Sequence, residues 1–241
     1  MAALLQLHAV SKHYGALKAV DGINVNVAAG EALAVIGPNG AGKTTLFNLI
    51  TGDAAPTKGH IEFGGLDVTA MPPHARSRLG IGRSYQIPHP FANMSVFENL
   101  LVGAIFGGGA GERESYRRCS EVLKATGLYD KANMPARTLT LLQRKRLEMA
   151  RALAMQPKLL LLDEIAGGLT EYECGELVKT IKEIHGRGTT IVWIEHIVHA
   201  LVSVASRLIV MDFGQILAQG DPREVMAEPR VREVYMGIPV S

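Results

Sequence analysis

The chain has 241 residues, 47% of them hydrophobic, and carries a formal net charge of +2 at pH 7. This length and apolar content suit one large α/β domain, or one domain that carries a subdomain. The nearly balanced charge argues against a nucleic-acid-binding surface.

Targeting signals are the next feature that the sequence can test. The opening residues, MAALLQLHAV, have neither a basic leader nor a long apolar stretch, so we expect no signal peptide. The apolar run 197–211 contains His199 and Arg207 and is shorter than the roughly 18 residues that a membrane span requires. Cys119 and Cys174 lie in polar helical sequence without metal-like spacing, which indicates a reduced, cytosolic compartment. We therefore expect a soluble protein.

In chain order, strand patterns alternate with helical ones. This alternation predicts a mostly parallel sheet, with the stretch 86–155 as a helical insertion that contains a glycine loop at 107–111. Asp221 and Pro222 predict the cap and the first position of a short helix near the end. The predicted strands are 4–10 and 23–27, followed by continuous apolar runs typical of buried parallel strands at 32–37, 158–164, 189–196 and 207–214, with a helix at 171–188.

The stretch TLTLLQRKRLEMARALA, residues 138–154, begins with a helix-start signal. Thr140 and Gln143 have the spacing of a capping box, so we expect a helix to begin here. A helix N-terminus exposes backbone N–H groups and favours an anion. The positions where an anion would approach, however, are Leu141 and Leu142 rather than glycine.

The segment GPNGAGKT fits the pattern G-x-x-x-x-G-K-[ST] and stands between a predicted strand and a predicted helix. Its backbone N–H groups can surround phosphate oxygens, Lys43 can reach the β- and γ-phosphates, and the Thr44 hydroxyl can bind Mg²⁺. The alternative, a chance glycine turn, is disfavoured by this context. The predicted ATP-binding residues here are Gly37, Pro38, Asn39, Gly40, Ala41, Gly42, Lys43, Thr44 and Thr45.

Two carboxylates end the predicted strand KLLLLDE. Asp163 can hold the Mg²⁺ shell and Glu164 can polarise an attacking water. A solvated acidic turn is the alternative, and alone it would be the better reading. Together with the phosphate loop the catalytic reading is favoured, because open α/β sheets bind ligands at the carboxyl ends of their strands.

Three further residues carry information only in combination. Tyr14 could be a packed turn aromatic, Gln86 an ordinary loop residue and His196 a hydrogen-bonded turn histidine. Taken in order with the phosphate loop, the stretch 139–143 and the carboxylate pair, they resemble the ATP-binding subunits of ABC transporters, over nearly the whole chain (4–237).

This resemblance implies a P-loop NTPase fold over residues 1–241: an α/β domain with a mostly parallel core sheet, N-terminal antiparallel strands, a helical subdomain at about 86–155 and a C-terminal tail at about 221–241. It implies that Tyr14 stacks on adenine, that Gln86 contacts the Mg²⁺ and water shell and senses a membrane partner, and that His196 acts at the γ-phosphate. The implied Mg²⁺ ligands are Thr44, Gln86 and Asp163, and the implied catalytic residues are Glu164, His196 and Gln86.

A narrower similarity is to the branched-chain amino acid and amide uptake ATPases. It is carried by YQIPHPFANMSVFENLLVG, by GQILAQGDPREVM and by the tail PRVREVYMG. Lipopolysaccharide-export ATPases have a similar tail. Within the first of these stretches, Ile87 and Phe91 predict an exposed docking surface for a membrane partner. The alternative is that they tuck into the helical subdomain.

The sequence departs from the family pattern at elements that face a partner subunit. By the resemblance, residues 139–143 occupy the L-S-G-G-Q signature, which clamps the ATP of the opposite subunit in trans. Ile165 stands where the family usually has Pro after the catalytic Glu. Thr170 stands in the D-loop, where the family usually has Asp or Asn. The pattern fits an asymmetric heterodimer, or else the leucine side chains point into the helical subdomain and the backbone still presents its N–H groups. The signature residues are Leu139, Thr140, Leu141, Leu142 and Gln143.

The resemblance thus implies an ATP-binding and ATP-hydrolysing subunit that uses ATP and Mg²⁺ to power import of branched-chain amino acids or related solutes. Its implied partners are a second ABC ATP-binding subunit, transmembrane permease subunits and, indirectly, a solute-binding protein, with no nucleic acid. The implied location is the cytoplasmic face of the cell membrane. The alternatives are a lipid or lipopolysaccharide exporter ATPase, a non-transport ABC ATPase and, with less support, a small-molecule P-loop kinase.

Overall fold

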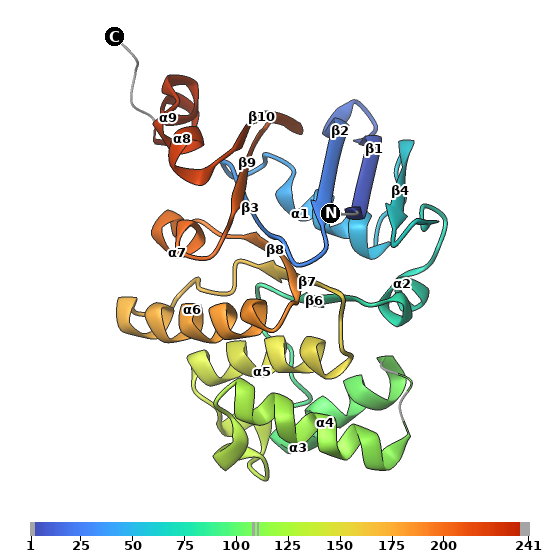
Figure 1. Cartoon of the computed structure of the whole chain (residues 1–241), viewed down its shortest axis with the longest axis vertical. Coiled ribbons are helices and arrows are strands. Elements are labelled where there is room, and N and C mark those ends of the chain that lie inside the picture. The colour runs from blue at the N-terminus through green and yellow to red at the C-terminus, as the bar shows by residue number, and fades with distance from the viewer. Residues whose placement is uncertain (1–2, 108, 110, 237–241) are drawn as a thin grey trace. The chain divides into compact units, whose positions relative to one another are not determined.

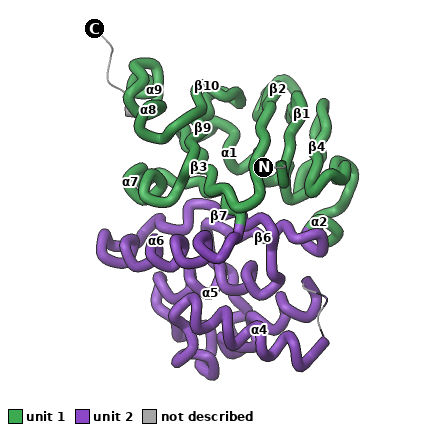
Figure 2. Tube along the Cα trace, in the orientation of Figure 1, with its two compact units in different colours: residues 1–76, 190–241 green, residues 77–189 purple. Residues whose placement is uncertain are grey.

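The computed structural model describes residues 3–107, 109 and 111–236. Its contacts divide the chain into two compact units, residues 1–76 with 190–241 and residues 77–189 (Figure 2). Two predicted features fall partly outside the described residues: Gly108 and Ala110 of the glycine loop, and positions 237–241 of the tail.

An antiparallel sheet forms one part of the first unit (Figure 1). Apolar side chains alternate along its strands, so that Leu5 and Leu7 are buried while the side chains between them face outward. The predicted N-terminal antiparallel strands are confirmed, and a strand at 58–63 that we did not predict joins them. The sheet has the order β2 (Leu17–Ala28), β1 (Ala3–Tyr14), β4 (Lys58–Phe63) and β5 (Leu66–Asp67).

A second group of strands in this unit carries the phosphate loop. Its central strand, β3 (Ala32–Ile36), is parallel to both neighbours, and all five of its residues are buried. The continuous apolar runs therefore form buried parallel strands, as predicted. The strand order is β10 (Gln215–Gly220), β9 (Arg207–Asp212), β3 and β8 (Thr190–Ile194), with β10 antiparallel to β9.

Short helices complete the first unit. Asp221 accepts hydrogen bonds from the N–H groups of Arg223 and Glu224, so the predicted cap before Pro222 is confirmed. No helix within the described residues is both long enough and apolar enough to cross a bilayer. The helices are α1 (Lys43–Thr51), α7 (Val198–Val202), α8 (Pro222–Ala227) and α9 (Pro229–Met236), with α2 (Pro73–Leu79) at the junction of the two units.

The second unit is mostly helical around two parallel strands, β6 (Ile81–Ser84) and β7 (Leu159–Asp163). A buried apolar cluster that includes Leu100, Cys119, Leu123 and Leu147 joins its helices. Cys119 belongs to this cluster, and Cys174 on α6 is also buried, although the sequence around both cysteines is polar. The other elements are α3 (Val96–Val102), the π-helix η1 (Gly103–Gly107), α4 (Glu112–Ala125), the short turns η2 (Tyr129–Lys131) and η3 (Ala136–Thr138), α5 (Leu141–Ala154) and α6 (Glu171–Gly186).

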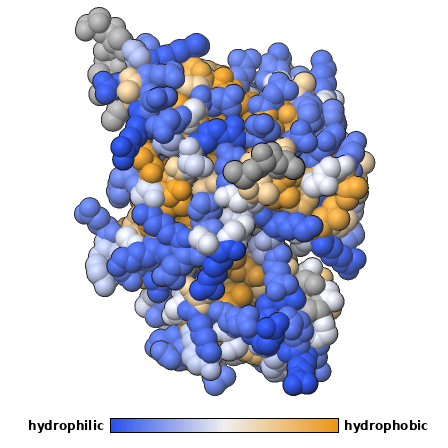
Figure 3. Space-filling view, in the orientation of Figure 1, coloured by the Kyte–Doolittle hydropathy of each residue, from blue (hydrophilic) through white to orange (hydrophobic). Residues whose placement is uncertain are grey.

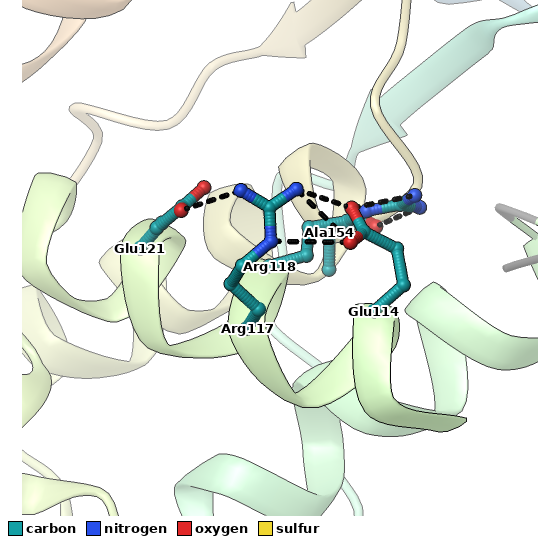
Figure 4. Close-up of polar contacts among 5 residues, drawn as sticks. All are labelled: Glu114, Arg117, Arg118, Glu121 and Ala154. Atoms are coloured by element: carbon teal, nitrogen blue, oxygen red, sulfur yellow. Dashed lines mark hydrogen bonds and ion pairs between the residues drawn. The ribbon is translucent and has the colours of Figure 1, made fainter. Parts of the chain in front are cut away.

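The solvent face of α4 shows how polar residues support this unit (Figure 4). Arg117 bonds to Glu114 and Glu121, which lie three and four residues away on the same helix. The neighbouring Arg118 is buried and donates to the carbonyl of Ala154 at the end of α5. Hydrophilic residues cover much of the face of the molecule seen in Figure 3.

Candidate active site

The predicted phosphate loop is built by close backbone packing. A Cβ atom at Gly37 would lie 2.2 Å from the carbonyl oxygen of Met211, and one at Gly42 would lie 2.2 Å from that of Ala19. Gly42 also has φ 99°, a left-handed conformation that favours glycine, and it stands at the N-cap of α1. Substitution at either glycine would therefore displace the loop, and the start of α1 presents backbone N–H groups where a phosphate can bind.

Lys43 lies at the first position of α1 and is 5% exposed. Its Nζ donates to the carbonyl oxygens of Gly37, at 2.8 Å, and of Pro38, at 3.1 Å. The ammonium group is thus held at the edge of its own loop by neutral acceptors, which an anionic phosphate oxygen can outcompete because charge-assisted hydrogen bonds are stronger.

Asp163, at the end of β7, forms a buried ion pair that the sequence analysis missed. Arg83 Nη2 on the neighbouring strand β6 donates to Asp163 Oδ2 at 2.6 Å, and the two side chains are only 6% and 5% exposed. The available signal was an arginine inside the buried strand IGRS, since an interior arginine usually has a carboxylate partner. The Asp163 carboxylate is therefore fixed in position.

Glu164 and Gln86 lie together in the second unit. Gln86 Nε2 donates to Glu164 Oε2 at 2.5 Å. Glu164 also has φ 46°, which is unusual for a residue other than glycine. Such backbone strain persists where the surrounding structure enforces it, and it concentrates at functional positions.

Lys145 is a second residue that the sequence analysis missed. It lies on α5 and is 4% exposed, and its Nζ donates to the carbonyl oxygens of Gln86 and Glu164, each at 3.4 Å. One buried ammonium group therefore connects the signature helix with the backbone of both catalytic candidates. The sequence could have indicated this residue, because Lys145 falls on the buried, mostly apolar side of the predicted helix.

The predicted signature residues begin α5 as expected. Thr140 Oγ1 accepts from the Gln143 N–H, and the Gln143 side chain accepts from the Thr140 N–H, so the capping box is confirmed. Leu141 is 45% exposed, and its Cδ2 lies 3.4 Å from where a Cβ on Gly168 would stand. The buried helical cluster of the second unit includes Leu139 but not Leu141. Leu142 is half-buried and is not part of the cluster either. Whether the backbone N–H groups of this helix start still serve a partner's ATP stays a prediction.

The other two departures have local explanations. Ile165 is 1% exposed and so is an ordinary core residue. Thr170 is the N-cap of α6 and forms a capping box with Glu173. Threonine, aspartate and asparagine all serve as N-caps, so Thr170 retains the helix-starting role at this position.

His196 follows β8 in the first unit, and its side chain is exposed. Its N–H donates to the buried carboxylate of Glu195 at 3.0 Å, and its carbonyl accepts from the Tyr235 hydroxyl at 3.1 Å. Tyr235 lies on α9, so the C-terminal helix holds the backbone of the predicted switch histidine. Tyr14, the predicted adenine contact, is 52% exposed at the end of β1, with Lys12 Nζ 5.0 Å from its ring centre.

The loop predicted to dock a partner, which contains Ile87 and Phe91, exposes apolar side chains, and Asn99 forms hydrogen bonds to its backbone at Phe91. Ile87 is 64% exposed and Phe91 is 44% exposed. The buried Asn99 side chain bonds to both the N–H and the carbonyl of Phe91, at 2.8 and 3.1 Å, and the Arg151 guanidinium lies 5.0 Å from the Phe91 ring centre. Both apolar side chains are therefore exposed to solvent, and hydrogen bonds from Asn99 hold the backbone of Phe91.

Comparison with known proteins assigns the family. The ABC transporter family profile matches residues 20–167, and that of the branched-chain amino acid ATP-binding cassette transporter matches residues 215–239. The branched-chain amino acid transport ATP-binding protein BraF of Pseudomonas aeruginosa is 34% identical over 97% of this chain and 98% of its own. The lipopolysaccharide export ATP-binding protein LptB of Acidithiobacillus ferridurans is also 34% identical, over 98% of each chain.

Solved structures agree. The ADP conformation of the ABC transporter cassette MJ1267 is 31% identical, covers 99% of this chain and all of its own, and superposes with a TM-score of 0.91. The dimeric cassette MJ0796 is 26% identical, covers 91% and 99% of the two chains, and has a TM-score of 0.81. The predicted fold class is confirmed, and the chain belongs to the ATP-binding, ATP-hydrolysing subunits of ABC transporters.

Proposed function

We propose that this chain powers an importer of branched-chain amino acids or related small solutes. The observation that carries the proposal is the match of residues 215–239 to the branched-chain amino acid cassette profile, because this part of the chain lies outside the nucleotide motifs that all ABC ATPases share. BraF, named for high-affinity branched-chain amino acid transport, supports the same solute class.

In this proposal Lys43 and the N–H groups at the start of α1 bind the phosphates, and Tyr14 contacts adenine. Glu164 orients and deprotonates the attacking water, with Gln86 holding its carboxylate, and His196 contacts the γ-phosphate. The hydroxyl, amide and carboxylate oxygens of Thr44, Gln86 and Asp163 are hard donors that fit Mg²⁺. When bound, Mg²⁺ would neutralise charge on the phosphates.

We further propose that the chain works at the inner face of the membrane, with a second ATP-binding subunit, a permease pair and, indirectly, a solute-binding protein. Ile87 and Phe91 would contact the permease. The exposure of both side chains supports this role, since exposed apolar patches mark interaction sites, and Asn99 holds the backbone of Phe91.

A second candidate is the ATPase of a lipopolysaccharide exporter. Its support is the relative LptB, which has the same identity to this chain as BraF and covers a similar share of it. Solute identity separates the two candidates.

The test is purification of the chain with its membrane subunits, followed by reconstitution into vesicles. ATP is supplied on the side of the vesicle membrane where this chain lies. We expect ATP-dependent uptake of labelled leucine. ATP-dependent extraction of lipopolysaccharide without leucine uptake would instead favour the exporter.

A substitution then tests the docking surface. Phe91→Asp should abolish transport while the isolated subunit keeps its basal ATPase rate. Tyr129→Asp is the matched control, because Tyr129 is similarly exposed, at 49%, on another part of the same unit. Equal transport by the two variants would contradict a docking role for Phe91.

A further inference from the structure

Three side chains with metal-binding atoms lie together on the antiparallel sheet, and the proposed ATPase function uses none of them. His8 belongs to β1, and His60 and Glu62 belong to β4. One ligand atom from each residue lies within 4.8 Å of the other two. We propose that His8, His60 and Glu62 bind a divalent transition-metal ion of the zinc type.

The strand register places the three residues on one face. His8 stands directly opposite His60 in the antiparallel pair of β1 and β4, and Glu62 lies two residues beyond His60 on the same strand. Their neighbours Leu7 and Ile61 point to the opposite face, where both are buried. Because side chains alternate along a strand, the two imidazoles and the carboxylate all face outward.

A bulge fixes the backbone beside this cluster. Ala9 has φ 48° and Gly59 has φ 81°, and the register shifts immediately after His8. A Cβ atom on Gly59 would lie 2.4 Å from the His8 carbonyl oxygen, so the two strands approach unusually closely here. The N–H of Ala9 donates to Asn24 Oδ1 at 2.9 Å. Bulges of this kind re-aim side chains, and this one holds His8 in a defined position.

The hydrogen-bonding capacity of the cluster is only partly satisfied within the described residues. His8 Nε2 is buried and has no hydrogen-bond partner among the described residues. The His8 and His60 rings stack with their centres 4.4 Å apart, and His60 Nε2 lies 3.6 Å from Glu62 Oε1. Gln6 Nε2 donates to the other oxygen of Glu62 at 3.4 Å. A metal ion would satisfy His8 Nε2, and Gln6 would orient the carboxylate as an outer-shell partner.

The ligand set decides which ion binds. Two imidazoles and one carboxylate suit Zn²⁺ and its neighbours, whereas Mg²⁺ requires oxygen ligands. Bonds of about 2.0–2.1 Å in a tetrahedral site put ligand atoms roughly 3.4 Å apart, so the cluster must contract. The His60 and Glu62 side chains are 47% and 33% exposed and can rotate to do so. A fourth position stays open to water, and the ion would link β1 to β4.

The experiment is a titration of the full chain, without nucleotide, with Zn²⁺ against a chromophoric zinc indicator, together with thermal unfolding with and without Zn²⁺. We expect one high-affinity ion per chain and a rise in Tm that EDTA reverses. His60→Ala and Glu62→Gln should each weaken binding at least tenfold and remove the Tm shift. The control is His74→Ala, an exposed histidine on α2, which should bind as the wild type does.

Because both substituted side chains are partly exposed, these variants should fold, and their metal-free Tm checks this. The proposal is overturned if wild-type affinity equals that of the two cluster variants, or if His74→Ala weakens binding equally. It is also overturned if excess Mg²⁺ displaces Zn²⁺ from the chain. None of these results depends on which solute the transporter carries.

Discussion

Replacing Arg83 with methionine would remove a cation that lies 2.6 Å from the Asp163 carboxylate. At that distance two unit charges attract by about 6 kcal/mol in an effective dielectric of about 20. The loss of hydration of two side chains that are only 6% and 5% exposed opposes this attraction. Methionine restores neither charge nor hydration to Asp163, and removal of one partner from a buried pair typically destabilises a protein by about 3–5 kcal/mol.

The assay is urea denaturation followed by circular dichroism, with three further proteins. Asp163→Asn in the Arg83→Met background should recover much of the loss, because it removes the buried charge. Arg117→Met is the matched arginine control: its side chain is 65% exposed in a helical ion pair, so we expect a loss below about 1 kcal/mol. Asp163→Asn alone completes the cycle.

Mg²⁺ and ATP add a second readout. If Asp163 faces Mg²⁺ as proposed, Mg²⁺ with ATP should return part of the stability that Arg83→Met loses, because a cation again faces the carboxylate. An Arg83→Met protein as stable as Arg117→Met would refute the reasoning about the buried pair.

Four further outcomes are expected. Lys43→Ala should weaken ATP binding about 10- to 150-fold, the equivalent of about 1.5–3 kcal/mol for one charge-assisted contact, and wild-type affinity in a nucleotide titration would remove Lys43 from the phosphate site. Glu164→Gln should keep ATP binding but slow turnover at least about 100-fold and accumulate an ATP-bound dimer in light scattering; unchanged turnover would exclude it as the general base. The double substitution Leu141→Gly and Leu142→Gly should raise the ATPase rate of the isolated protein. It should also destabilise the first turn of α5 by about 0.5–1 kcal/mol per glycine. A folded variant no faster than wild type would show that the leucines do not obstruct the approach of ATP to this helix. Burial raises the pKa of Cys119 to about 11, so its thiol should resist alkylation at pH 8 until the chain unfolds, and rapid labelling of the native protein would contradict that burial.

Local signals in the sequence predicted local structure well. The capping box at Thr140 and the cap at Asp221 form as expected, because each needs only residues three positions apart. The missed helix α9 also had such a signal, since Pro229 stands at its first position. The strand at 58–63 carried only a short apolar pattern, with buried Ile61 and Phe63, and was missed.

Polar contacts between residues far apart in the chain could not be predicted from the sequence. Arg83 and Asp163 are 80 residues apart, and Lys145 and Gln86 are 59 apart. Hydrophobic periodicity assigns a residue to the interior but does not identify its partner. The strand-end pattern predicted the role of Glu164 and the resemblance implied that of Gln86, whereas the cations Arg83 and Lys145 were found only in the structure.

Two hydrogen bonds of Lys145 give a scale for how strongly the segments that they join can influence each other. A movement that carries the backbone of Gln86 away from that of Glu164 would change at least one of the two 3.4 Å contacts of this ammonium group. Contacts of that length lie at the weak end for a charged donor, about 1.5 kcal/mol each. These two contacts together therefore contribute about 3 kcal/mol to the linkage, which corresponds to a change of roughly 150-fold in the affinity for one ligand when the other is bound. Linkage is reciprocal. The factor by which a membrane partner that shifts Gln86 changes the affinity of the signature helix for nucleotide equals the factor by which that nucleotide changes the affinity for the partner.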